Sequence, residues 1–131
     1  MNKNIKITID LDNQTKDETL SSEEIEQTVL TVLQEKGVTG NIELGIKICG
    51  QEKMREINRE FRQIDAPTDV LSFPIWESIP AKIEEPILLG DIIICPDILR
   101  QNAREYGVTE REEFIKMIAH GTLHLLGFHH K

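Results

Sequence analysis

Ile87-Leu-Leu-Gly-Asp-Ile-Ile-Ile-Cys95 is the stretch of sequence that decides the fold. It is apolar at almost every position, and a run that is apolar on both faces is typical of a central, buried strand. Two earlier segments, 5–11 and 42–49, alternate apolar and polar residues with the period of two that predicts half-buried strands. A shorter strand is predicted at 68–74, where a proline ends the segment. We therefore expect a sheet of four strands.

Helical signals occupy the segments between and after these strands. Ser21 with Glu24, and Thr109 with Glu112, have the spacing of capping boxes. In a capping box, the side chain of each of the two residues accepts a hydrogen bond from the backbone amide of the other. Glycines after three of the helices, and a proline in the first turn of one of these three, are further boundary signals. Four helices are expected: from Ser21 to Gly37, over 51–63, from Pro96 to Gly107, and from Thr109 to about Leu126.

The order of these elements predicts an α+β fold. A helix between the first two strands favours a parallel crossover, and the two later strands allow one antiparallel neighbour. We expect a mixed four-stranded sheet packed with about four to five helices, in a single domain of residues 1–131. On the helix at 51–63, we expect Met54, Ile57 and Phe61 to face the core.

Composition limits the class of protein. The 131 residues, 39% of them hydrophobic, suit a globular chain with one core. The longest unbroken apolar run, 92–95, is far shorter than the about 18 residues of a membrane-spanning helix. Residues 1–13 lack the apolar stretch of a secretory signal peptide. Two cysteines, Cys49 and Cys95, make no disulfide framework and are expected to be buried thiols. We expect a cytoplasmic protein with no membrane partner.

The net charge argues against a generic nucleic-acid binder. Lys and Arg number 15, Asp and Glu number 23, and the formal net charge is −8. Phosphate repels a net anion, whereas non-specific nucleic-acid binding depends on basic surface. Any contact with nucleic acid must therefore come from a local patch.

The histidines carry the strongest chemical signal, because all four lie within the last twelve residues. His120 and His124 are four apart on a predicted helix, so both imidazoles lie on one face. Gly127 allows the chain to reverse and bring His130 over the same face. Three neutral imidazoles around one Zn²⁺ ion leave a fourth position for water, as in catalytic zinc sites. The spacing after the glycine favours His130 over His129 as the third ligand.

The same histidine spacing occurs in metzincin peptidases, which suggests a second hypothesis. Those enzymes use a glutamate directly after the first histidine as general base, and here that position is Gly121. A glycine cannot accept a proton, so peptide hydrolysis is disfavoured. Phosphodiester hydrolysis depends more on the metal and on positive groups around the phosphoryl oxygens. A metallopeptidase, or another zinc hydrolase with an external base, stays the alternative.

Several blocks together resemble the YbeY family. They are Pro67-Thr-Asp-Val-Leu-Ser-Phe-Pro74, Asn58-Arg59, Leu89-Gly-Asp-Ile92 and the motif from His120 to His130. The resemblance covers about residues 42–130. It implies a metal-dependent, single-strand-specific endoribonuclease that acts in ribosomal RNA maturation, especially at the 3′ end of the small-subunit RNA, and in ribosome quality control.

Site residues follow from this resemblance. It places His120, His124 and His130 on the family's zinc ligands and Arg59 on its invariant arginine, which is implicated in activity. The family usually has aspartate directly before the third ligand, where this chain has His129. The implied partners are ribosomal RNA, the ribosome, and ribosomal or assembly proteins. A third hypothesis is a non-enzymatic ribosome-assembly factor with a structural metal, because a charge of −8 suits docking on basic proteins.

Secondary candidates have both structural and functional interpretations. Arg59 shares a helix face with Arg55 and Arg62, which forms either a phosphate-gripping stripe or a solvated surface. Thr68 and Ser72 are common strand residues that can also hydrogen-bond substrate. Asp69 and Asp91 can orient a ligand histidine or accept hydrogen bonds from nearby loops. For Asp91 we expect the structural role, within a buried strand.

Overall fold

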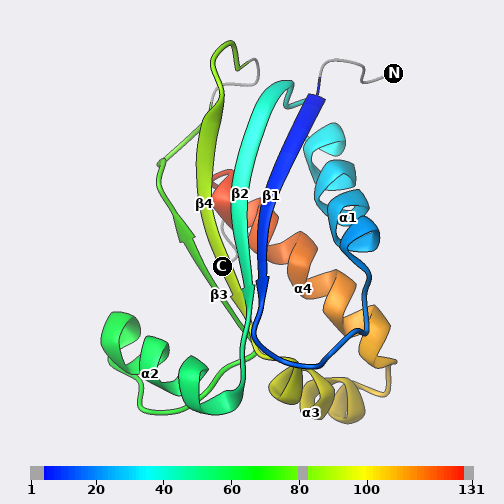
Figure 1. The fold of residues 1–131 in the computed structure, drawn as a ribbon, viewed down its shortest axis with the longest axis vertical. Helices are drawn as coiled ribbons and strands as arrows, with labels where there is room; N and C mark the ends of the chain where they lie inside the picture. The colour runs from blue at the N-terminus through cyan, green and yellow to red at the C-terminus, as the bar shows by residue number, and fades with distance from the viewer. Residues whose placement is uncertain (1–4, 80–82, 129–131) are drawn as a thin grey trace.

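The computed structural model describes residues 5–79 and 83–128. Within these residues, strands and helices follow the predicted order (Figure 1). The α+β prediction is confirmed, and four helices accompany the four strands in the described part of the chain. The elements are β1 (Ile5–Asn13), α1 (Ser22–Glu35), β2 (Gly40–Ile48), α2 (Gln51–Arg62), β3 (Val70–Pro74), β4 (Ile87–Ile94), α3 (Pro96–Tyr106) and α4 (Glu110–Leu125).

The strands form one mixed sheet in the order β1-β2-β4-β3. β1, β2 and β4 run parallel, and β3 pairs antiparallel with β4. Ser72 of β3 lies opposite Ile92 of β4, and Pro74 lies opposite Gly90. The predicted parallel crossover and the single antiparallel neighbour are therefore confirmed, with β3 as an edge strand.

Helices α1 and α4 cover one face of the sheet and form the main core with it (Figure 1). Alternate strand residues point into this core, as the period of two predicts. Both capping boxes are present, at Ser21 with Glu24 in front of α1 and at Thr109 with Glu112 in front of α4. The largest fully buried side chains of this core are Ile25, Leu33, Ile42, Leu44, Ile46, Leu89, Ile92, Ile94, Leu99, Ile118 and Leu125.

The opposite face is covered at one end only, where α2 packs on the sheet. Met54 and Ile57 of α2 are buried against Leu71 and Ile93, in a small second cluster that also holds both cysteines. The prediction for Phe61 is wrong, because its side chain is 54% exposed. In Figure 1, α2 extends beyond the edge of the sheet. The Phe61 ring still meets Phe73 of β3 edge to face, with ring centres 5.3 Å apart, while its other side is open.

The expectation that β4 is buried on both faces is also wrong in part. Asp91 is exposed on the open face, and Leu88 is 46% exposed. By contrast, Leu89, Ile92 and Ile94, which belong to the core with α1 and α4, are fully buried. Hydrophobic pattern identified the strand correctly, but whether a second layer covers its other face depends on where α2 packs.

Both cysteines are free and buried, as expected. Burial raises the pKa of the Cys49 thiol to about 11 and also raises the pKa of Cys95. A thiol in such surroundings stays protonated and unreactive near neutral pH. The cysteines are therefore part of the packing between α2 and the sheet.

Candidate functional site

Two histidines form the centre of the site. His120 and His124 lie on one face of α4, near its C-terminal end, and both are half-buried. Their ring centres are 4.5 Å apart and the ring planes are tilted by 53°. The predicted i,i+4 pairing is therefore present. Two neighbouring imidazoles on one helix face are a suitable part of a zinc site, because a neutral imidazole nitrogen is a common zinc ligand.

The third ligand lies outside the part of the chain that the structure describes. His130, the predicted ligand, and His129, its alternative, both follow the last described residue. Among the described residues there is no group of three His, Cys, Asp or Glu side chains that could hold a metal ion. The three-histidine centre therefore stays a prediction, supported by the geometry of two of its members.

The turn that would bring a third ligand back begins at Gly127. Its φ is +97°, a left-handed conformation that favours glycine, as the motif predicted. A Cβ atom here would lie 2.8 Å from the backbone oxygen of Glu77, in the segment that follows β3. The end of α4 therefore packs closely against this segment, and a larger residue at 127 would push the two apart.

Ser72 connects the histidine pair to the sheet. Its Oγ lies 3.2 Å from Nδ1 of His124. The side chain points to the α4 face of β3, while its neighbours Leu71 and Phe73 pack on the α2 side. The sequence does not reveal this contact, because the two residues are 52 positions apart and serine is common in strands.

A close approach between α4 and β4 sets the position of both histidines. Gly121, which follows His120, is buried against Ile92. A Cβ atom at position 121 would lie 3.1 to 3.2 Å from three side-chain atoms of Ile92. Glycine is therefore required here by packing, and a larger side chain would lift the helix from the strand.

This contact also bears on the peptidase alternative, which needs a glutamate at position 121. We expect Gly121→Glu to destabilise the protein by at least about 2–3 kcal/mol, because overpacking and carboxylate burial both cost energy. We also expect no peptidase activity, since the new side chain would be directed at Ile92. Urea denaturation and a peptide-cleavage assay measure the two effects. A stable Gly121→Glu protein that cleaves peptides would contradict this expectation.

Arg59 lies on the other side of the sheet from the histidines. Its Nη1 is 3.4 Å from Oδ1 of Asp65, and its side chain is exposed. Arg55 holds the same carboxylate more tightly, through two bonds of 2.8 and 3.1 Å. The hydrogen bond from Arg55 holds the pKa of Asp65 below its ordinary range. Since α2 and α4 pack on opposite faces, the described contacts tie Arg59 to Asp65 rather than to the histidine pair.

Arg62 is the arginine of α2 that reaches the strand next to the site. Its Nη2 donates a hydrogen bond to the backbone oxygen of Ser72, at 3.2 Å. Its guanidinium also lies 5.1 Å from the ring centre of Phe73. The predicted stripe of Arg55, Arg59 and Arg62 is therefore largely engaged by the protein itself, in contacts with Asp65 and β3.

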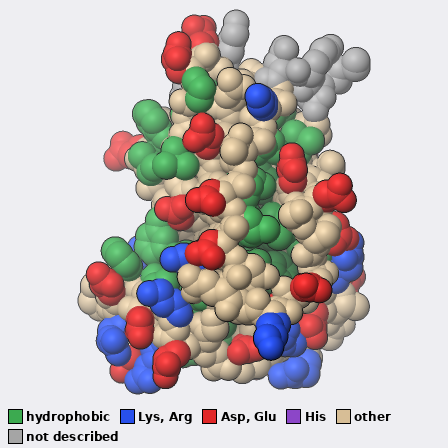
Figure 2. Space-filling model, viewed as in Figure 1, with side chains coloured by type: hydrophobic (Ala, Val, Ile, Leu, Met, Phe, Trp, Pro, Cys, Tyr) green, Lys and Arg blue, Asp and Glu red, His purple; other side chains and the backbone are tan. Residues whose placement is uncertain are grey.

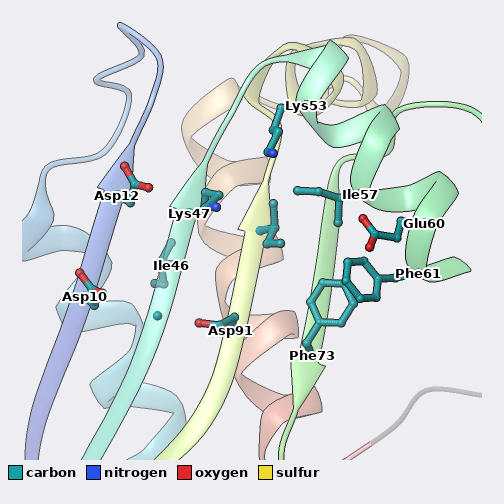
Figure 3. A pocket seen from close by; sticks show the side chains of 12 residues that line it. Asp10, Asp12, Ile46, Lys47, Lys53, Ile57, Glu60, Phe61, Phe73 and Asp91 are labelled. Atoms are coloured by element: carbon teal, nitrogen blue, oxygen red, sulfur yellow. The ribbon is translucent and has the colours of Figure 1, made fainter.

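A groove of about 680 Å³ lies on the open face of the sheet, beside α2 (Figure 3). Neither described histidine lines it, and Figure 2 shows none on this face. In Figure 3, Asp10 and Asp91 lie on either side of β2. Four carboxylates line the groove beside only two lysines. Such a surface repels phosphate, so this groove does not suit an RNA backbone.

Asp69 has a structural role. Its carboxylate accepts hydrogen bonds from the backbone of Val70 at 2.7 Å and from Asn102 of α3 at 3.1 Å. Its own backbone oxygen accepts from the amide of Cys95, at 2.9 Å. The sequence left two roles open for Asp69: orienting a ligand histidine, or accepting hydrogen bonds from neighbouring segments. These contacts favour the second role, in which Asp69 connects the start of β3 to α3.

Over residues 5–79 and 83–128, the structure has no helix with the length and apolarity needed to cross a bilayer.

Comparison with known proteins identifies the family. The family model described as "Endoribonuclease YbeY" matches residues 10–131. A relative from Sulfurihydrogenibium sp., named endoribonuclease YbeY, is 43% identical over 114 residues, covering 84% of this chain and 73% of its own. Relatives of the same name from Thermotoga neapolitana and Bacillus velezensis are 39% and 38% identical, covering 70% and 82% of this chain. The matches span 56% and 72% of those two relatives.

A solved structure shares the fold. The solution structure of protein TM1509 from Thermotoga maritima aligns with a TM-score of 0.65 and 30% sequence identity. The alignment covers 95% of this chain and 75% of that protein. The sheet and helices described above, the histidine pair, and the match over most of the chain all agree: the chain belongs to the YbeY endoribonuclease family.

Proposed function

We propose that this chain is a metal-dependent endoribonuclease that hydrolyses single-stranded RNA in ribosomal RNA processing, including maturation of the small-subunit 3′ end, and in ribosome quality control. Its membership of a family whose relatives are named endoribonucleases supports the reaction class. The observation that carries the chemistry is the pair of half-buried imidazoles on α4, whose ring centres are 4.5 Å apart. We propose that residues 1–131 act as one domain, in the cytoplasm.

The residues proposed to hold the metal are His120, His124 and His130, around one Zn²⁺ ion. Bound there, zinc would supply Lewis acidity for a phosphoryl oxygen and for the attacking water. The protein contributes the orientation of the imidazoles, through the packing of α4 on β4 and the contact with Ser72. The structure also offers no general base at Gly121, which suits phosphodiester better than peptide hydrolysis.

Removal of the metal tests this proposal. We expect the purified protein to contain about one zinc per chain, and exhaustive chelation to abolish cleavage of a single-stranded RNA. Zinc added back should restore cleavage, and a fully double-stranded RNA of the same sequence should resist it. Cleavage retained by protein shown to be metal-free would contradict the proposal. Zinc binding without RNA cleavage would favour the assembly factor with a structural metal.

Arg59 is proposed to neutralise charge that develops on the phosphoryl oxygens. Because Arg59 lies on the α2 side of the sheet, this role requires the RNA to pass around the edge strand β3 between Arg59 and the histidines. Its guanidinium is exposed, and its bond to Asp65 is longer than those of Arg55. An exposed ion pair of this kind contributes little to stability, so Arg59 can exchange Asp65 for a phosphate at low cost. Arginine suits this role because its planar donors match phosphate geometry.

Arg55 provides a matched control for Arg59, since both contact Asp65. We expect Arg59→Ala to lower RNA cleavage by about ten- to a hundredfold, through the loss of about 1.4–2.7 kcal/mol of transition-state stabilisation. Arg55→Ala should change cleavage less than threefold. Steady-state cleavage of one RNA by the three proteins gives the answer. Equal losses from both substitutions would mean that Arg59 acts only through Asp65.

The proposed partners are ribosomal RNA within the ribosome, and ribosomal or assembly proteins. The net charge of −8 supports protein partners, because basic ribosomal proteins attract an acidic surface that naked RNA repels. RNA contact is then confined to the region of the histidines and the arginines of α2.

A further inference from the structure

Ser72 is a residue of the sheet whose side chain meets one of the proposed metal ligands, His124. We propose that Ser72 is a positioning residue, whose Oγ accepts a hydrogen bond from Nδ1–H of His124 and so presents the lone pair of Nε2 to the metal. This inference rests on the proposed function, because it requires His124 to be a ligand. From the sequence, Ser72 was a candidate only for a hydrogen bond to substrate, and the family match assigns no role to it.

The direction of this hydrogen bond follows from the chemistry of a neutral imidazole. The ring carries one proton, so one nitrogen donates and the other offers a lone pair. With Oγ of Ser72 3.2 Å from Nδ1, the hydroxyl is able either to accept from that nitrogen or to donate to it. If Ser72 donated, Nε2 would carry the proton and could not bind a metal. Ligation through Nε2 therefore requires Ser72 to be the acceptor.

The fold brings this pair together through three successive contacts. Ser72 pairs across the sheet with Ile92 of β4. Ile92 in turn packs against Gly121, where the absence of a side chain lets α4 approach the strand. His124 lies nearly one helical turn beyond Gly121, within reach of the hydroxyl. A shift at any of these contacts would separate Oγ from Nδ1.

Ser72 is itself held in place from the opposite side of β3. Its backbone oxygen accepts the hydrogen bond from Arg62, and its strand forms a ladder with β4. An acceptor on a rigid strand restricts the orientation of the imidazole more than one on a mobile loop. The orientation of the His124 ring therefore depends on β3 as well as on α4.

A purely structural role is the competing interpretation, in which the bond only fastens α4 to the sheet. Such a bond stabilises the fold modestly, whichever of the two atoms carries the proton. The positioning role predicts two further results. The proton of neutral His124 lies on Nδ1, and zinc affinity falls in a variant that lacks the hydroxyl at position 72 but not in a variant of similar shape that keeps it.

Threonine and valine at position 72 are a matched pair, since they have similar shapes and differ in the hydroxyl. We expect Ser72→Val to weaken zinc binding by at least about tenfold, the lower end of the effect of losing a partner of a ligand histidine. Ser72→Thr should stay within about threefold of the unchanged protein. Competition with a chromogenic chelator measures the affinity, and thermal denaturation verifies that both variants fold. Equal zinc affinities in Ser72→Thr and Ser72→Val would overturn the proposal.

Imidazole nitrogen NMR on the unchanged, metal-free chain tests the proton directly and needs no variant. At a pH where His124 is neutral, we expect the proton on Nδ1, and a proton on Nε2 would overturn the inference. The chelator experiment separates this failure from failure of the proposed function. If the unchanged protein does not bind zinc, the metal centre itself is wrong. If it binds zinc but His124 carries its proton on Nε2, only the role of Ser72 is wrong.

Discussion

Replacing His124 by alanine is expected to remove both zinc binding and RNA cleavage. The substitution deletes one of the two neighbouring imidazoles described on α4, so His120 loses the ligand beside it. We expect zinc affinity to fall by more than the roughly 10–100-fold that loss of an outer partner costs. Cleavage should fall to background, because the Lewis acid is lost with the metal.

Metal analysis and an RNA-cleavage assay on the same preparation measure the two losses. Gln101→Ala, at an exposed position of α3, is the control and should keep full zinc content and activity. Thermal denaturation shows whether His124→Ala still folds, which we expect because the imidazole is only half-buried. A folded His124→Ala protein that keeps its zinc would contradict the assignment of this histidine. Zinc loss with full cleavage would contradict the metal-dependent mechanism.

Replacing Gly90 by alanine is expected to destabilise the protein strongly. The φ of Gly90 is +142°, a region that other residues rarely adopt. A Cβ atom there would lie 2.2 Å from the backbone oxygen of Phe73 and 3.0 Å from Cδ2 of Leu125. The clash is with backbone, which a rotamer change cannot relieve. We expect a loss of about 3–5 kcal/mol, as strain and overpacking add.

Gly107 is the matched control, because its φ is also positive, at +71°, while no atom lies within 4 Å of a Cβ built there. Gly107→Ala should cost only the backbone penalty of about 1–2 kcal/mol. Urea denaturation of both variants gives the difference, provided that their m-values agree. Equal destabilisation of the two variants would show that the contact between β3, β4 and α4 is less tight than described. Because Gly90 pairs with Pro74, close to Ser72, zinc affinity should also fall in Gly90→Ala.

Local signals predicted most of the fold. The capping boxes at Ser21 and Thr109 depend on groups three residues apart, and both formed as the sequence indicated. The alternation in β1 and β2 likewise depends on neighbouring residues. These patterns succeed because their energetics are decided within a turn of helix or a short stretch of strand.

The errors concern exposure rather than element type. Phe61 lies on the helix face that periodicity assigns to the core, and Asp91 lies in a strand that reads as central. Both side chains are exposed, because α2 covers only one end of the open face. Periodicity states which residues share a face, and only the placement of the neighbouring layer decides whether that face is buried.

For the candidate site too, the sequence predicted which residues share a helix face, and the structure decided which distant residues meet them. Sequence spacing alone put His120 and His124 on one helix face, and their rings do lie together. The family resemblance adds Arg59 to the site, whereas the described contacts of Arg59 are on the other side of the sheet. In the sequence, Gly121 indicates that the general base of the peptidases is absent. The structure adds that Ile92 fills the space where a side chain at position 121 would be.

By itself, the sequence determined the elements of the sheet and helices, the pair of imidazoles on α4, and the family. Each of these depends on residues close together in the chain or on blocks of characteristic sequence. Only the tertiary structure decided that Ser72 meets His124, that Arg62 supports Ser72, and that α2 leaves much of one sheet face open. These are contacts between distant segments, and they depend on strand register and on how closely a helix can approach a strand.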